Sequence, residues 1–369
     1  MAQTGLHTNR QRLRELLRGM IDIYSPSGKE GELVSFLEGR LRKAGMKVIR
    51  RPVEEDRDNL LVLPGDVEPE LVFLGHVDTV AAFDYDQYKC EESGDEMAGL
   101  GAADMKSGCA AMVEAFTAFE ELTDREAPAA LALVVGEEES GDGTSALLED
   151  YRFSWAVVAE PTNLLPCLSH YGYIEMELST TGRRVHASLA NQGANAVRSM
   201  LQVLMGLTAH LEESRRDVIY NIRDMNSSHA GFAVPDRCDV AIDLHLPPQS
   251  PVGEIAAELE DVVSRTLPKG LDLRDAFEFC TLHGGYALPD KGWLPDLLRA
   301  TYSRHGLPWS PGAFRSHSDA NLLWAEGIRP IMLGPGQLEK AHTQDESVSF
   351  SQVALAADLY LDLLASMPV

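Results

Sequence analysis

Side chains that bind metal ions and transfer protons stand directly after apolar segments at several places in this chain. The segments LVFLGHVD, LALVVGEEE and AVVAE each end in such residues, and others stand in the turn GLGAAD and after GPGQLEKA. The candidates are His76, Asp78, Asp104, Glu137, Glu138, Glu139, Glu160 and His342. Because histidine and carboxylate ligands suit zinc, this inventory predicts a metal site.

The number of candidates fits a pair of ions. Two metal ions about 3.5–4 Å apart can share one carboxylate and hold a water molecule between them. One histidine and one terminal carboxylate for each ion, with one shared aspartate, leave a glutamate over as a proton carrier. Asp78 lies on the same side of an extended segment as His76 and can accept a proton from the imidazole nitrogen that faces away from a metal.

Each motif also has an ordinary structural explanation. A single histidine at a strand end is usually a structural residue, and three consecutive glutamates usually form a solvated loop. Glu160 precedes Pro161 and fits a simple surface turn. The functional interpretation therefore depends on the motifs occurring together.

Buried strands must deliver these side chains to one place. Residues 71–74 are apolar and precede a glycine and a polar turn, which predicts a buried strand with His76 and Asp78 just past its end. Helical spacing of apolar residues covers residues 13–21, and Ser27 with Glu30 forms the pattern of a capping box at the start of a second helix. The alternation of strands and helices predicts an α/β domain with a mixed, mostly parallel sheet flanked by helices. In such sheets, ligands bind at the carboxyl ends of the strands.

The pattern changes after about residue 171. The order strand, helix, two strands, helix, strand predicts a small α+β domain of ferredoxin-like type with its helices on one face. Its helices are expected at about residues 194–213 and 252–267. Helix and strand alternation resumes near residue 294 and ends in a closing helix. We therefore expect a discontinuous catalytic domain, residues 1–170 and 284–369, with an inserted domain at residues 171–283.

The composition restricts the possible partners. Lys and Arg number 32 against 57 Asp and Glu, a formal charge of −25 that disfavours nucleic acid and anionic membranes. The five cysteines are scattered without a CxxC pair, as in a reduced cytosolic protein. No signal-peptide core or membrane-length apolar segment is present, so we expect a cytoplasmic protein that acts on small molecules.

In these motifs the sequence resembles a family of zinc exopeptidases and deacylases. The family includes acetylornithine deacetylase, succinyl-diaminopimelate desuccinylase, glutamate carboxypeptidase and aminoacylase. The resemblance covers nearly the whole chain, and its motifs stand in order as GHVDTV, GLGAADMKSG, VVGEEESG, VVAEPT, GRRVHASLANQGANAV and GPGQLEKAHTQDE. Singly each motif is moderate evidence, whereas the ordered set is highly specific.

The resemblance implies a role for each candidate. His76, Asp104 and Glu160 would hold one Zn²⁺, and Asp104, Glu138 and His342 the other, with Co²⁺ or Mn²⁺ as possible substitutes. Glu137 would be the general base for an attacking water, and Asp78 the partner of His76. The inserted domain would be a lid that forms a homodimer, and His186 from the second subunit's lid would donate to the oxyanion.

Two positions depart from the family pattern. Members commonly carry an asparagine before the VPD segment of the lid and an arginine after the next strand's aspartate, where this chain has Phe232 and His245. Histidine lacks the bidentate fork and permanent charge of arginine, so the usual anchor for a substrate carboxylate is altered. Arg315 and His317 are candidates to compensate, although an ordinary loop also explains them.

Other functional interpretations of the sequence are either excluded or left open. GLGAAD lacks the third glycine of a dinucleotide-binding turn, and no GxSxG motif of a serine hydrolase occurs. Within the hydrolase class, the sequence does not decide between an N-acyl amino acid deacylase and a dipeptidase or carboxypeptidase. A non-hydrolytic metal-binding protein is the alternative from another class, and the retained Glu137 argues against it.

Overall fold

The chain folds into two compact units. The structure is a computed structural model that describes residues 6–65, 68–82, 88–229, 231–268 and 273–367. Unit 1 comprises Met1–Ser169, Leu288–Phe314 and Ser318–Val369, and unit 2 comprises His170–Ala287 and Arg315–His317. The second unit is therefore an insertion into the sequence of the first, together with three residues from a later segment.

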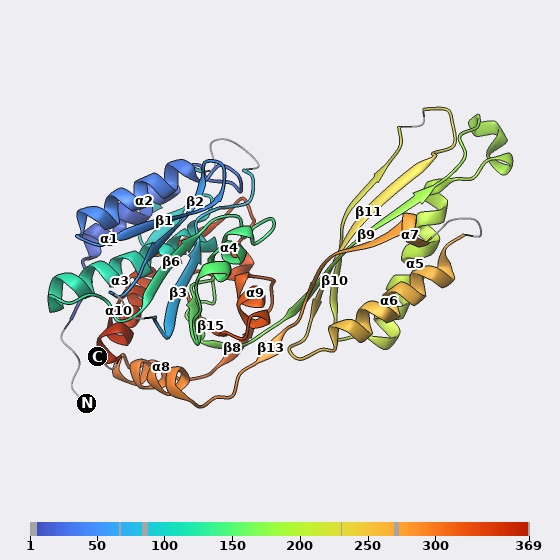
Figure 1. Cartoon of the computed structure of the whole chain (residues 1–369). Helices are drawn as coiled ribbons and strands as arrows, with labels where there is room; N and C mark the ends of the chain where they lie inside the picture. Colours follow the sequence, from blue (N-terminus) through green and yellow to red (C-terminus); the bar gives the residue numbers. More distant parts are fainter. Residues whose placement is uncertain (1–5, 66–67, 83–87, 230, 269–272, 368–369) are drawn as a thin grey trace. The chain divides into compact units, whose positions relative to one another are not determined.

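Unit 1 is built on a mixed sheet with the strand order β1-β2-β6-β3-β7-β15-β8 (Figure 1). The four central strands β6, β3, β7 and β15 are mutually parallel, whereas β1, β2 and β8 pair antiparallel at the two sides. The strands are β1 (Val48–Glu54), β2 (Arg57–Val62), β3 (Leu71–His76), β6 (Ala130–Val134), β7 (Trp155–Val158), β8 (Cys167–His170) and β15 (Arg329–Met332). This arrangement confirms the predicted fold class.

Helices cover this sheet because its central strands are apolar on both faces. All six residues of β3 and all five of β6 are buried, as expected of strands in the middle of a parallel sheet. The long α3 and α10 pack against each other, and α4 packs against α9 (Figure 1). The helices are α1 (Arg10–Ile21), α2 (Gly31–Lys43), α3 (Ser107–Thr123), α4 (Asp142–Asp150), α8 (Trp293–Arg304), α9 (Asp319–Ala325) and α10 (Phe350–Ser366).

Short elements complete unit 1. A three-stranded sheet joins β16 (Ser347–Ser349), β5 (Glu96–Ala98) and β4 (Glu91–Ser93) in that order. A π-helical turn, η2 (Ala102–Lys106), precedes α3, and a single 3₁₀ turn, η4 (Leu338–Lys340), follows β15. β14 (Gly312–Phe314) pairs with β8. β13 (Tyr286–Ala287) is not part of unit 1 and falls within unit 2.

Unit 2 is an antiparallel sheet with helices on one face, as predicted (Figure 1). Its strand order is β10-β11-β9-β12, and the side chains of β9 alternate between buried and more exposed. The buried set, which includes Ile174, Met176 and Leu178, packs in one core with apolar residues of α5 and α6. The elements are β9 (Gly172–Thr181), η3 (Ala187–Gln192), α5 (Ala196–Ser214), β10 (Ile219–Ser227), β11 (Arg237–Leu246), α6 (Val252–Thr266), α7 (Leu273–Ala276) and β12 (Phe277–His283).

One predicted helix start is wrong. Helix α2 begins at Gly31, and its N-cap Glu30 makes no capping hydrogen bond. Glu30 is fully buried and pairs with Arg57, while the Ser27 hydroxyl donates to Asp78. The two residues that resembled a capping box therefore have tertiary partners, and the serine supports the candidate site instead.

Within the described residues, no helix is both long enough and apolar enough to span a bilayer.

Candidate metal centre

Three adjacent parallel strands deliver candidate ligands to one edge of the unit 1 sheet. His76 is the last residue of β3, and it pairs with Val134, the last residue of β6. Glu137 and Glu138 follow β6 after a two-residue turn, and Glu160 stands two residues after β7. Because β6, β3 and β7 are neighbours and run in the same direction, their carboxyl ends bring these side chains together.

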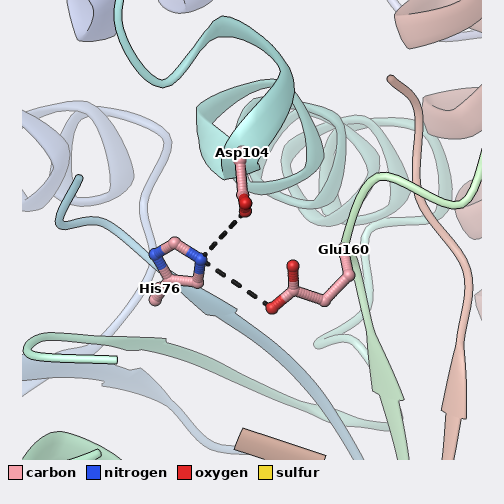
Figure 2. A group of neighbouring side chains, drawn as sticks. All are labelled: His76, Asp104 and Glu160. Atoms are coloured by element: carbon pink, nitrogen blue, oxygen red, sulfur yellow. Dashed lines mark hydrogen bonds and ion pairs between the residues drawn. The ribbon is translucent and has the colours of Figure 1, made fainter. Parts of the chain in front are cut away.

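The first group of potential ligands is His76, Asp104 and Glu160. The Nε2 of His76 lies 3.3 Å from Oδ1 of Asp104 and 3.8 Å from Oε1 of Glu160, and Figure 2 shows the three side chains pointing toward one another. All three are buried. Oε1 of Glu160 has no hydrogen-bond partner among the described residues, so this buried oxygen is available to a cation.

The second group is Asp104, Glu138 and His342. The Nε2 of His342, which follows η4, lies 3.0 Å from Oε2 of Glu138 and 3.5 Å from Oδ2 of Asp104. The two oxygens of Asp104 thus face different histidines, one in each group. This shared carboxylate has the arrangement needed to bridge two cations.

Asp78 contacts both the turn that carries the glutamates and the ring of His76. Its carboxylate accepts hydrogen bonds from the backbone N–H groups of Glu137 and Glu138, at 3.2 and 3.0 Å. The Nδ1 of His76 lies closer to the backbone carbonyl of Asp78, at 3.1 Å, than to its carboxylate, at 3.5 Å. The carboxylate therefore chiefly fixes the glutamate turn, and the carbonyl of the same residue orients the imidazole.

The three consecutive glutamates have different environments. Glu139 is exposed, whereas burial raises the pKa of Glu138 and raises the pKa of Glu137 well above its usual range. Oε2 of Glu137 lies 3.8 Å from Nε2 of His76, although Glu137 belongs to neither ligand group. A carboxylate with a raised pKa beside a cluster of potential metal ligands is suited to taking up and returning a proton.

The charges of the cluster favour divalent cations. Burial raises the pKa of Glu160 well above its usual range, and the hydrogen bond that the His342 ring donates to Glu138 raises the pKa of His342 to about 9. Burial opposes ionisation of Asp104, but the adjacent His76 and His342 together offset this effect, and the pKa of the carboxyl group is lowered. Crowded buried carboxylates are costly unless they are paired or coordinate metals, so the residues present fit a pair of ions.

Two further buried carboxylates near the cluster were not identified from the sequence. Glu346, four residues after His342, accepts hydrogen bonds from the turn that contains Asp104. Asp319, at the start of α9, lies beside Gly141 in the loop that follows the glutamates. The only signals in the sequence were a glutamate after HTQD and an aspartate in SHSDAN, and neither distinguishes a buried carboxylate from an exposed one.

The buried carboxyl group of Asp319 is expected to make the stability of the folded protein depend on pH. It is 2% exposed, neither of its carboxylate oxygens has a hydrogen-bond partner within the described residues, and burial raises its pKa to about 7. Between the usual pKa near 3.8 and this value, the folded state binds more protons than the unfolded state, so stability falls as pH rises through this window. We expect Asp319→Asn to remove this fall and to be more stable than the natural chain at pH 8, by several degrees in Tm, with a much smaller difference at pH 5. Thermal unfolding of both proteins across this range tests the prediction, and parallel curves would contradict it.

The remaining predicted residues lie in unit 2. His186 is exposed, and its Nδ1 lies 2.8 Å from the hydroxyl of Ser188.

Phe232 is 88% exposed, whereas His245 packs against Tyr173 with ring centroids 5.4 Å apart. His317 stacks on His283, with Nε2 and Nδ1 separated by 2.7 Å, and Arg315 is exposed. Burial lowers the pKa of His245 and lowers that of His317 to about 3, so neither supplies the permanent positive charge of an arginine.

Comparisons with known proteins agree with this architecture. The sequence model of peptidase family M20/M25/M40 matches residues 72–366. N-formyl-4-amino-5-aminomethyl-2-methylpyrimidine deformylase of Bacillus subtilis is 26% identical, over 99% of this chain and 96% of that protein. Acetylornithine deacetylase of Edwardsiella ictaluri is also 26% identical, over 95% and 96% of the two chains. A tripeptidase from Staphylococcus aureus has the same fold, with a TM-score of 0.79 and 19% identity over 97% of this chain and 98% of that one.

Proposed function

Because the chain belongs to peptidase family M20/M25/M40, a family of hydrolases that act on amide bonds, we propose that it is a two-metal amidohydrolase. One observation carries the proposal: Asp104 is common to two separate groups of potential metal ligands, so that its two oxygens can serve two ions. The proposed reaction is cleavage of the amide bond of an N-acyl amino acid or a short peptide by water.

The proposed ligands are His76, Asp104 and Glu160 for one ion and Asp104, Glu138 and His342 for the other. Mixed imidazole and carboxylate ligands suit Zn²⁺, and Co²⁺ or Mn²⁺ tolerate similar sets. Ions bound there supply Lewis acidity for the amide carbonyl and lower the pKa of a coordinated water. The unpartnered oxygen of Glu160 supports this assignment, since coordination gives a buried acceptor the partner that the protein does not provide.

Glu137 acts as general base and then as general acid in the proposed mechanism. Its carboxylate takes a proton from the attacking water and returns it to the nitrogen of the leaving amine. The turn that carries it is fixed by Asp78, which accepts the N–H groups of Glu137 and Glu138. Burial raises the pKa of Glu137, which makes its carboxylate a stronger base than an exposed glutamate.

Unit 2 is the proposed lid and dimerisation domain. His186 from the lid of a second subunit is the proposed donor to the developing oxyanion, a role that suits an exposed imidazole. Its Nδ1 accepts the backbone N–H of Ser188, which leaves Nε2 as the protonated nitrogen in the neutral ring. A cytoplasmic homodimer is the proposed form of the protein.

The substrate is either an N-acyl amino acid or a short peptide. The two relatives named above remove formyl and acetyl groups, and the structural neighbour is a tripeptidase. The neutral His245 and His317 favour a substrate that does not need a permanent positive charge to hold its carboxylate. The alternative of a non-hydrolytic binding protein gives no role to a proton carrier such as Glu137.

Metal analysis and a substrate panel test the proposal. We expect two metal ions per chain and hydrolysis of at least one member of a panel of N-formyl, N-acetyl and N-succinyl amino acids, dipeptides and tripeptides. Acyl compounds and peptides of the same amino acid form matched pairs, so the panel also separates deacylase from peptidase activity. Two bound metals without hydrolysis of any member would favour the binding protein, and a chain that binds no metal would overturn the proposal.

A further inference from the structure

Glu346 holds the turn that carries Asp104. The side chain is 5% exposed. Its Oε2 accepts the backbone N–H of Gly101 at 2.8 Å, and its Oε1 accepts those of Ala103 and Asp104 at 2.9 and 3.0 Å. The backbone carbonyl of the same residue accepts the N–H of Gly99 at 3.1 Å. One residue therefore satisfies four N–H groups of the segment that leads into Asp104.

This turn needs an acceptor from outside. Gly101 has a left-handed backbone, with φ of 78°, and a Cβ at this position would lie 2.7 Å from the Cγ2 of Thr79. Residues 100–104 are all buried, and the turn is too irregular for each N–H to find a partner within it. Unpaired N–H groups in such a place are costly, so the conformation of the turn depends on the Glu346 carboxylate.

Glu346 also ties together two sequence segments that carry potential ligands. It stands four residues after His342, and the strand that follows it, β16, pairs with β5 just before the Asp104 turn. Asp104 and His342 are thus held in register by the same contact between residues 96–104 and 342–349. Since Asp104 belongs to both ligand groups, an error in its position affects both ions.

Glu346 contacts the backbone of the turn and is not one of the potential ligands. Both of its carboxylate oxygens accept backbone N–H groups, and neither ligand group among the described residues includes it. Asp78 makes the same kind of contact on the other side of the cluster, where its two oxygens accept the N–H groups of Glu137 and Glu138. Two buried carboxylates thus each hold one turn that carries a proposed ligand.

We propose that Glu346 is a positioning residue that fixes the backbone of Asp104 and thereby sets the carboxylate shared by the two metal ions. This inference rests on the proposed two-metal function. Residues that orient metal ligands typically contribute 10- to 100-fold in metal affinity or activity.

The test is Glu346→Gln. The amide keeps the size of the side chain, but its NH₂ group must face either the N–H of Gly101 or those of Ala103 and Asp104, so at least one hydrogen bond is lost. We expect metal dissociation constants, measured by competition between Zn²⁺ and a chelator, to rise about 10- to 100-fold. At saturating metal, kcat is expected to fall with little change in KM, because the shared ligand remains misplaced.

Two further variants complete the test. Glu346→Asp keeps the charge but withdraws the carboxylate by one methylene, about 1.5 Å, and is expected to weaken metal binding as well. The matched control is Asp95→Asn. Asp95 is exposed, and it contacts the other end of the same segment by accepting the hydroxyl of Ser349. We expect this control to keep the metal affinity of the natural chain.

The outcomes separate this inference from the proposed function. If the natural chain binds no metal pair, the proposed function itself fails. If the natural chain binds two ions and Glu346→Gln or Glu346→Asp binds them equally well, Glu346 is not a positioning residue. Weakening by Asp95→Asn as large as that by the Glu346 variants would also overturn the inference, because any loosening of the segment would then suffice. If Glu346→Gln does not fold, the test is whether Glu346→Asp binds metal more weakly than the Asp95→Asn control.

Discussion

Replacing Glu137 by alanine is expected to lower kcat about 10²- to 10⁴-fold while the protein keeps two bound metal ions per chain. Glu137 lies in neither ligand group, so its loss removes the proton carrier without removing a ligand. The backbone N–H of residue 137 remains available to Asp78, and the turn that carries Glu138 is therefore expected to keep its position. Steady-state kinetics and metal analysis of the same preparation measure the two quantities.

The neighbouring glutamate supplies a matched control. Glu139 is exposed, two residues further along the same loop, and Glu139→Ala changes the charge of the protein by the same amount. We expect its kcat and metal content to equal those of the natural chain. Full activity of Glu137→Ala would mean that Glu137 is not the base, and an equal loss in Glu139→Ala would mean that the loop charge matters rather than one carboxylate.

Replacing Asp104 by alanine is expected to abolish binding of both metal ions and to reduce hydrolysis to background. Its two oxygens face His76 and His342 separately, so one substitution removes a ligand from each group. Each group then retains one histidine and one glutamate. Metal content after dialysis against a weak chelator, together with activity, tests this expectation.

His342→Ala distinguishes a shared ligand from an ordinary one. His342 belongs to one group only, so this variant is expected to lose one ion and retain the other at His76, Asp104 and Glu160. The comparison is informative because both variants remove a single ligand residue. An Asp104→Ala protein that still binds two ions, or one that loses no more metal than His342→Ala, would contradict the bridging role.

Much of the fold followed from local patterns. The apolar segments around residues 71–74 and 131–135 were expected to be buried strands, and β3 and β6 are buried along their whole length. The element order of the inserted unit was also predicted, because strands with alternating apolar residues and helices with apolar stripes have different periods. The error at Ser27 arose because its hydroxyl has a partner more than fifty residues away, in Asp78, which a local capping pattern does not contain.

The candidate ligands were accessible to sequence reasoning because they stand at strand ends. His76, Glu138 and Glu160 follow three apolar segments, and parallel strands place such positions at one edge of a sheet. Glu346 and Asp319 were not accessible, since neither follows a strand in the central sheet and each becomes significant only through burial. A carboxylate in a polar loop has the same appearance in sequence whether it faces water or a buried turn.

The sequence by itself determined which side chains were available for metal chemistry and which strands would carry most of them, because hydrophobic periodicity and residue type are local properties. Only the tertiary structure decided that Asp104 presents one oxygen to each histidine, that Glu137 is partly buried while Glu139 is exposed, and that Glu346 holds the Asp104 turn. These are distances and exposures between segments up to about 240 residues apart. They are set by how the strands and loops pack together, and no short stretch of the chain encodes them.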